Sequence, residues 1–203
     1  EIYSKKIKAE PYSYGLNAGD IRALNVQVKD AQFVFDVSLN NKVINGFQLS
    51  VPGFHNVENA VVAIAIANQL GVSEKEIIEG IKTYKGVKRR FEYVIQRDGF
   101  VFIDDYAHHP SEIKAMLTSV RALYPGKKVS VLFQPHLYSR TRDFAVEFSQ
   151  SLSLADEVML LDIYPARELP IEGVSSDILL ESIQVDEKYK VEKESIVEYL
   201  SNR

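Results

Sequence analysis

The chain of 203 residues contains no cysteine. It can therefore form neither a disulfide nor a thiolate metal site, and we expect it to work in a reducing compartment such as the cytoplasm. It also lacks an apolar run long enough to span a bilayer, and its first residues lack the pattern of a secretory signal. We therefore expect no membrane partner.

An excess of positive charge is missing too. The 24 Lys and Arg residues, against 28 Asp and Glu residues, give a formal net charge of −4. This balance argues against a nucleic-acid-binding protein, which needs a basic footprint, and against a polybasic membrane patch. The chain begins at Glu1 rather than at an initiator methionine, and we interpret it as a piece of a longer protein.

The first third of the chain predicts a small antiparallel sheet and two helices. Apolar residues alternate with other residues over 33–39 and 43–49, with Asn40-Asn41 between them, which is typical of a hairpin. A third strand is expected over 23–28. The Ala-, Ile- and Val-rich stretch 56–70 is apolar on most faces and predicts a buried helix.

A second helix is expected to follow, because Ser73 and Glu76 have the spacing of a capping box. The charged run 85–88, which contains a glycine, then marks a change of pattern. We predict one domain over 1–87 and another over 88–203.

The second domain shows strands alternating with helices. Strands are expected over 93–95, 100–103, 128–133 and 157–161, and helices over 110–123, 141–154, 175–183 and 195–200. Strands and helices of this length predict βαβ units, and hence an α/β fold with a mainly parallel sheet.

The densest group of ionisable residues follows the strand 100–103, whose four apolar residues predict a strand buried on both faces. Pro110 and Glu112 suit the start of the next helix. The polar loops 134–140 and 162–168 follow the next two strands. The carboxyl ends of parallel strands share one edge, so we expect one rim of three loops, suited to a substrate with an anion and an amine.

Three interpretations of the first loop stay open. Asp105, His108 and His109 are ordinary metal ligands by residue type. Alternatively, an aspartate caps the helix at Pro110 while a histidine packs beneath it. The third interpretation is a ligand site without a metal.

The second loop offers His136 as a site residue and Arg140 as a clamp for a carboxylate. Arg142 is more simply explained by an ion pair on the surface with Asp143 or Glu147.

Two earlier stretches also have a plain and a functional interpretation. Asn56 is a good N-cap, but an Asn amide also matches the edge of adenine, and Asn59 lies one turn further on the same face. The run Lys88-Arg89-Arg90-Phe91 is either a solvated cluster or a grip for phosphate, because Arg binds phosphate with a planar fork.

Five motifs appear in the order Val51-Pro52-Gly53-Phe54-His55-Asn56-Val57-Glu58-Asn59-Ala60, Gly86-Val87-Lys88-Arg89-Arg90-Phe91, Asp104-Asp105-Tyr106-Ala107-His108-His109-Pro110, Phe133-Gln134-Pro135-His136 and Tyr164-Pro165-Ala166. Together they resemble the Mur ligase family of peptidoglycan synthesis, and within it the ligases that add the first amino acid. The resemblance covers residues 12–183.

This resemblance implies an ATP-dependent amide ligase that joins L-alanine to UDP-N-acetylmuramate through an acyl phosphate, with Mg²⁺ as the metal. It implies ATP binding by His55, Asn56, Asn59, Arg90 and Asp105, substrate binding by Tyr106, His108, His136 and Arg140, and no metal ligand in this chain. It also implies the end of a central ATPase domain, made of a hairpin and helices, followed by a truncated Rossmann-like C-terminal domain with helices on both faces of its sheet.

Parts of the family pattern are absent. The chain has no phosphate loop, and it lacks the family's magnesium-binding Glu and His, its N-terminal UDP-binding domain and a Gly-Ala-Gly-Asp strand. Leu137 replaces a common arginine, and Arg167 a common glycine. We interpret the chain as an interior fragment that is inactive alone. The alternatives are a sister ligase that adds a preformed peptide, a metal-dependent hydrolase using the first loop, and a non-catalytic ligand-binding domain.

Overall fold

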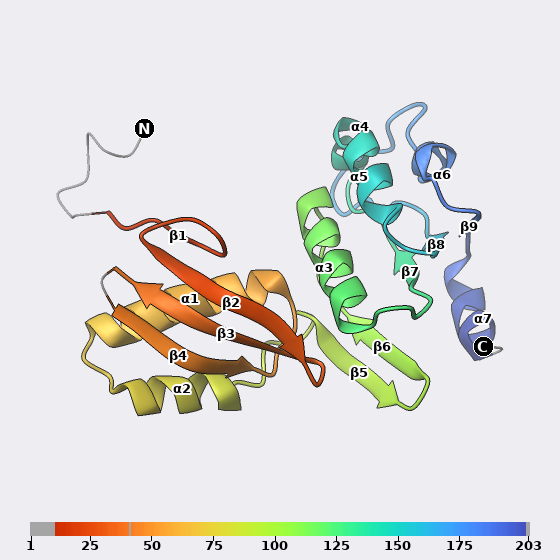
Figure 1. Ribbon diagram of the computed structural model, residues 1–203. Helices are drawn as coiled ribbons and strands as arrows, with labels where there is room; N and C mark the ends of the chain where they lie inside the picture. The colour runs from red at the N-terminus through yellow and green to blue at the C-terminus, as the bar shows by residue number, and fades with distance from the viewer. Residues whose placement is uncertain (1–10, 41, 202–203) are drawn as a thin grey trace. The chain divides into compact units, whose positions relative to one another are not determined.

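The computed structural model describes residues 11–40 and 42–201 (Figure 1). The chain divides into two compact units, one up to Asp105 and the other from Tyr106 onward, and each is described by itself. This division by contacts does not test the predicted domain boundary between residues 87 and 88, which stays a prediction.

The first unit contains a four-stranded sheet in the order β1-β2-β3-β4. Its strands are β1 (Tyr14–Gly15), β2 (Ile21–Lys29), β3 (Gln32–Leu39) and β4 (Lys42–Leu49). β3 pairs antiparallel with both β2 and β4, which confirms the predicted hairpin and third strand. Asn40 turns with φ at 52°, whereas Asn41 of the predicted turn lies outside the described residues.

Two helices complete this part: α1 (Phe54–Gln69) contacts β2, and α2 (Glu74–Thr83) lies against β4 (Figure 1). The capping box of Ser73 and Glu76 is confirmed. The expectation that α1 is buried on most faces is wrong. One face is buried, while the side chain of Ile66 is 52% exposed, because the sheet covers the helix from one side only.

The strands β5 (Glu92–Arg97) and β6 (Phe100–Asp104) form an antiparallel hairpin. This corrects the prediction that 100–103 is a doubly buried strand of a parallel sheet, because every residue of β6 is half-buried and its partner is β5. The physical reason is the short Asp98-Gly99 link, with Gly99 at φ 79°. A link of two residues joins antiparallel strands, whereas a parallel connection needs a dozen or more.

The second unit is built on a parallel sheet in the order β7-β8-β9, which confirms the predicted α/β class. Its strands are β7 (Ser130–Phe133), β8 (Glu157–Leu160) and β9 (Glu187–Lys190). Its helices are α3 (Pro110–Leu123), α4 (Tyr138–Asp143), α5 (Ala145–Leu152), α6 (Asp177–Ser182) and α7 (Ile196–Ser201), and the 3₁₀ turn η1 (Lys193–Ser195) precedes α7. Helix α3 has the predicted bounds. The predicted loop 134–140 is too long, because α4 begins at Tyr138, and β9 was not predicted.

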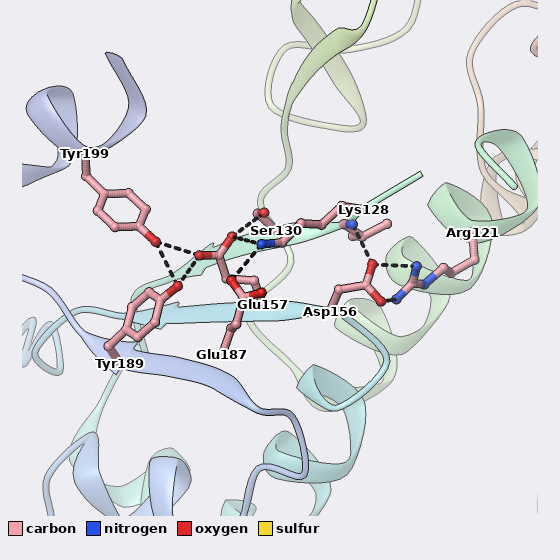
Figure 2. Close-up of polar contacts among 9 residues, drawn as sticks. Arg121, Lys128, Ser130, Asp156, Glu157, Glu187, Tyr189 and Tyr199 are labelled. Atoms are coloured by element: carbon pink, nitrogen blue, oxygen red, sulfur yellow. Dashed lines mark hydrogen bonds and ion pairs between the residues drawn. The ribbon is translucent and has the colours of Figure 1, made fainter. Parts of the chain in front are cut away.

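A polar network lies at the amino edge of this sheet, where Ser130, Glu157 and Glu187 are the first residues of their strands (Figure 2). The Glu157 carboxylate is fully buried. It accepts hydrogen bonds from the hydroxyls of Ser130 and Tyr199, each at 2.5 Å, and from the hydroxyl of Tyr189. The network therefore joins all three strands to the C-terminal helix α7, at the edge opposite to the polar loops.

Candidate functional site

The carboxyl edge of the parallel sheet brings the loops after β7 and β8 together. His136 and Tyr164 form a parallel β-bridge, and their rings stack with centroids 5.5 Å apart. The backbone N–H of Leu137 donates to the carbonyl of Tyr164 at 3.0 Å, and that of Tyr164 to the carbonyl of Pro135 at 2.8 Å. These contacts confirm that the two loops share one rim.

The segment that leads into α3 joins the same rim. The ring of His108 lies edge-on to the ring of His136, with centroids 6.5 Å apart, and edge-on to Tyr106 at 5.4 Å. Its Nδ1 lies 3.0 Å from the carbonyl oxygen of Tyr106 and 3.4 Å from a carboxylate oxygen of Glu112. Tyr106, His108 and His136 are thus gathered as the sequence predicts.

Arg140 supplies the positive charge of this rim. It lies on α4, and Glu168 holds the start of that helix by accepting hydrogen bonds from the backbone and the hydroxyl of Ser139, at 2.9 and 2.5 Å. The Nη1 atom of Arg140 is buried and has no hydrogen-bond partner among the described residues. A buried guanidinium donor without a partner costs free energy, so the site suits an anionic ligand.

The protonation states around Arg140 follow from the same packing. Burial lowers the pKa of His136 below its ordinary value of 6.5, and the charges of Arg140 and His108 lower it further, against the opposing effect of Glu168. Hydrogen bonds from Ser139 lower the pKa of Glu168. At neutral pH the rim therefore contains a neutral His136 beside a guanidinium and a carboxylate.

His109 is not part of the rim. It is the N-cap of α3, its Nδ1 lies 2.8 Å from the hydroxyl of Ser111, and its ring packs on Phe144. The interpretation in which an aspartate caps this helix is therefore wrong. Arg142 pairs with Asp143 at 2.8 Å, as expected for a surface residue.

In the first unit, the candidate nucleotide residues lie at the start of α1. The N-cap is Gly53, with φ at 120°, so the interpretation of Asn56 as the cap is wrong. Instead, the amide Nδ2 of Asn56 donates to the carbonyl of Pro52 at 2.7 Å. This bond fixes the plane of the amide. Asn59 is exposed one turn further along the helix, and the half-buried His55 lies beside Gly53.

A cavity of about 330 Å³ lies between residues 50–52 and 85–93. Pro52 and Arg90 both line it, so the carbonyl that orients Asn56 belongs to the same wall as Arg90. The carboxylate of Asp105 accepts the backbone N–H of Phe91 at 2.8 Å. Arg90 lines the cavity itself, whereas Asn56 and Asp105 each form a hydrogen bond with a lining residue, Pro52 and Phe91.

Sequence reasoning missed two residues of the rim. Glu112 was expected only to favour the helix dipole, yet its carboxylate also lies at His108. Glu168, at the end of the third loop, holds Ser139 through its carboxylate. The capping-box spacing of His109 and Glu112 could have indicated the first, whereas the second depends on a contact between distant loops.

The parts of the chain that the structure describes contain no group of three or more His, Cys, Asp or Glu residues placed to hold a metal ion. The hydrolase interpretation therefore lacks its metal centre there. No helix in these parts is both long and apolar enough to cross a bilayer.

The fold is that of an α/β protein with a parallel sheet, and each of its two units contains a candidate site. Residues 89–202 match the family model described as the Mur ligase, glutamate ligase domain, and residues 2–67 match the Mur ligase middle domain. The first match covers more than half of the chain. The chain belongs to the Mur ligase family.

Individual relatives agree with this assignment. The UDP-N-acetylmuramate–L-alanine ligase of Christiangramia forsetii is 48% identical over 93% of this chain and 42% of that protein. The enzyme of the same name from Cytophaga hutchinsonii is 49% identical over 88% of this chain and 38% of that protein. The crystal structure of the UDP-N-acetylmuramate–alanine ligase from Thermotoga maritima matches with a TM-score of 0.76 and 30% identity, over 93% of this chain and 41% of that one. The chain thus spans about two fifths of the length of these relatives.

The fold extends to more distant proteins. A MurF ligase from Thermotoga maritima, solved in complex with ADP, matches with a TM-score of 0.69 at 18% identity, over 94% of this chain and 42% of that one. At this identity the likeness shows the fold alone.

Proposed function

We propose that the complete protein is an ATP-dependent ligase that joins L-alanine to UDP-N-acetylmuramate in peptidoglycan synthesis, in the cytoplasm, through an acyl phosphate. The observation that carries this proposal is the buried Nη1 of Arg140, which has no partner among the described residues. A planar guanidinium matches a carboxylate bidentately, and an amino acid offers one. Arg140, His108 and His136 form its site.

The nucleotide side of the proposal rests on the cavity in the first unit. An Asn amide has two N–H donors and one acceptor, and one donor of Asn56 is bound to Pro52. The remaining donor and the acceptor suit the edge of adenine. Arg90 lines the cavity and suits a phosphate. These residues therefore fit ATP, which supplies the phosphoryl group that activates a carboxylate.

Magnesium is assigned to another part of the protein. The described residues hold no cluster of ligands for it. We propose that Mg²⁺ and the main phosphate contacts belong to domains outside this chain, because the aligned region makes up only 42% of the Christiangramia forsetii relative. A phosphate loop upstream of Glu1 would support this.

The competing substrate is a preformed peptide. We favour L-alanine because the relatives described above, which share 48% and 49% of their aligned residues with this chain, are L-alanine ligases.

The two sites can be separated by mutation of the complete enzyme. A charge-assisted hydrogen bond is worth about 1.5–3 kcal/mol, so its loss weakens a ligand roughly 10- to 150-fold. Arg140→Ala is expected to raise the KM for alanine by that factor and to leave ATP affinity unchanged, whereas Arg90→Ala is expected to do the reverse. Steady-state kinetics with calorimetry of ATP binding measures both.

Arg142→Ala is the matched control, because it removes an arginine from the same helix whose partner is Asp143. It is expected to change neither constant. If Arg140→Ala weakens ATP as much as alanine, or leaves alanine unaffected, the assignment of this rim to the amino acid is wrong.

A further inference from the structure

The position of the proton on His108 follows from its neighbours. Nδ1 lies 3.0 Å from the carbonyl oxygen of Tyr106 and 3.4 Å from the carboxylate of Glu112. Both oxygens accept hydrogen bonds, so the neutral imidazole carries its hydrogen on Nδ1. The other ring nitrogen, Nε2, is then the one with a lone pair, and His108 is set to accept a proton there.

Backbone hydrogen bonds hold the carboxylate of Glu112 in its position at Nδ1 of His108. Its Oε2 accepts the backbone N–H of His108 at 2.9 Å and that of His109 at 3.1 Å, in the capping box of α3. A carboxylate fixed by two backbone donors keeps a constant position at the imidazole. A histidine base whose ring is oriented by a fixed carboxylate is a common arrangement in acid–base catalysis.

The base and the cation that takes the carboxylate both lie near His136. The rings of His108 and His136 are 6.5 Å apart, and both His108 and Arg140 act on the charge of His136. The amine of an amino acid is two bonds from the carbon of its carboxylate. A carboxylate held by Arg140 therefore places the amine within this small rim.

We propose that Nε2 of His108 is the general base that takes the proton from the amine of the incoming amino acid, with Glu112 as its positioning residue. This proposal rests on the ligase function proposed above. An ammonium group has no lone pair and cannot attack a carbonyl. One proton passes to Nε2 of His108, and the neutral nitrogen forms the new N–C bond. The C–O bond to phosphate then breaks, and phosphate leaves with that electron pair and with the second proton of the nitrogen.

The groups around His108 suit this role. Glu112 faces Nδ1, where its carboxylate lies 3.4 Å from the ring nitrogen. His136 stays neutral at neutral pH and adds no charge, and the ionised Glu168 offsets part of Arg140. Tyr106 contributes its carbonyl oxygen.

The test uses the complete enzyme and two nucleophiles. Hydroxylamine is largely uncharged at neutral pH and needs no base, so it reports formation of the acyl phosphate as a hydroxamate. His108→Gln is expected to lower kcat with alanine by about 10²–10⁴-fold, the range for general base catalysis, and to leave the rate of hydroxamate formation within a few-fold of wild type.

The positioning role of Glu112 has its own readout. Glu112→Gln keeps an oxygen for the helix cap but removes the charge at Nδ1. We expect kcat with alanine to fall roughly 10- to 100-fold, as for other residues that orient a functional histidine, and the acidic limb of its pH profile to move to lower pH. The matched control is Glu76→Gln, the same change in the capping box of α2, which is expected to leave the profile unchanged.

The outcomes separate this inference from the proposed function. If the wild-type enzyme neither joins alanine to UDP-N-acetylmuramate nor gives hydroxamate, the ligase proposal itself fails. If wild type gives hydroxamate but His108→Gln keeps its rate with alanine, or loses both activities equally, His108 is not the base. If Glu112→Gln has the same pH profile as wild type and the same melting temperature as Glu76→Gln, Glu112 does not position His108.

Discussion

At the scale of single residues, positive φ angles collect at both candidate sites. Arg89 and Phe91, at φ 58° and 51°, flank Arg90, while Leu137 at 73° precedes α4 and Ala166 at 52° lies in the third loop. Residues with side chains rarely adopt this region, and such strain persists where the surroundings enforce it. The surrounding structure therefore holds the backbone at these four positions, as it does at Asn25, Asp30, Ala31 and Asn40 in the first sheet.

Gly53 offers a direct test of one such constraint. A Cβ at this residue would lie 2.7 Å from Cε1 of His55, and the φ of 120° suits glycine alone. We expect Gly53→Ala to lower the free energy of unfolding by about 1–3 kcal/mol. The control is Gly80→Ala, inside α2 with no atom near its Cβ, which is expected to stabilise by about 0.5–1 kcal/mol.

Urea unfolding followed by circular dichroism measures both changes. A Gly53→Ala protein as stable as wild type would show that the start of α1 adjusts without strain, and the account of His55 packing against Gly53 would then be wrong.

Residue types indicated which side chains lie together better than they indicated local roles. The loops after β7 and β8 meet at the carboxyl edge of the parallel sheet, as expected. Tyr106 and His108 join them from the segment that follows the antiparallel strand β6, through the contact of His108 with His136. By contrast, Gly53 caps α1 where Asn56 seemed suited, and His109 caps α3 where an aspartate seemed suited. Several residue types can cap a helix, and the choice depends on the path of the backbone before it.

At the scale of elements, the helices and strands that were predicted correctly are those with a clear apolar periodicity or a clear end signal in the sequence. The alternation in 33–39 gave β3, and Pro110 marked the start of α3. The strand β9 was missed because its four residues, Glu187 to Lys190, are mostly charged and lack an apolar run. Its place beside β8 comes from tertiary pairing, which local pattern does not contain.

The hydrogen bonds to Glu157 predict that removing one tyrosine hydroxyl lowers the stability of the fold measurably. Tyr199→Phe removes a donor to a fully buried carboxylate, and we expect it to lower the free energy of unfolding by about 1.5–3 kcal/mol. Tyr84→Phe, at an exposed tyrosine, is the control and is expected to stay within about 0.5 kcal/mol of wild type.

Hydrogen exchange locates the effect of Tyr199→Phe. Amides of β9 and α7 are expected to lose protection first, since Tyr189 and Tyr199 attach them to Glu157. Equal stability of the Tyr199→Phe and Tyr84→Phe proteins would mean that the network does not hold the C-terminal helix.

At the scale of the whole molecule, the chain has a cavity lined by Arg90 in one unit, for which we propose a nucleotide, and the rim of His136 and Arg140 in the other, for which we propose an amino acid. The order of elements predicted the α/β class of the second unit. The grouping of β5 and β6 with the first unit was not predicted, because the change of pattern at 85–88 was interpreted as the start of a second domain whose strands all belong to a mainly parallel sheet.

We expect the 203-residue chain to fold but not to ligate. Its sequence lacks a phosphate loop, and sites of this kind are assembled from several domains. Incubation with ATP, Mg²⁺, UDP-N-acetylmuramate and L-alanine is expected to release no alanine-dependent phosphate, whereas the complete protein, as the control, releases it. Release by the chain alone would contradict the division of the site between this chain and further domains.

The burial of Glu157 also has a consequence for biosynthesis. Its partner Tyr199 lies 42 residues further along the chain. At roughly 5–20 residues per second, the ribosome adds those residues in about 2–8 s. Tyr189, on β9, follows after the first 32 of those residues. For most of the delay β8, whose residues are all buried in the folded protein, therefore lacks β9 at one edge and both tyrosine hydroxyls at Glu157.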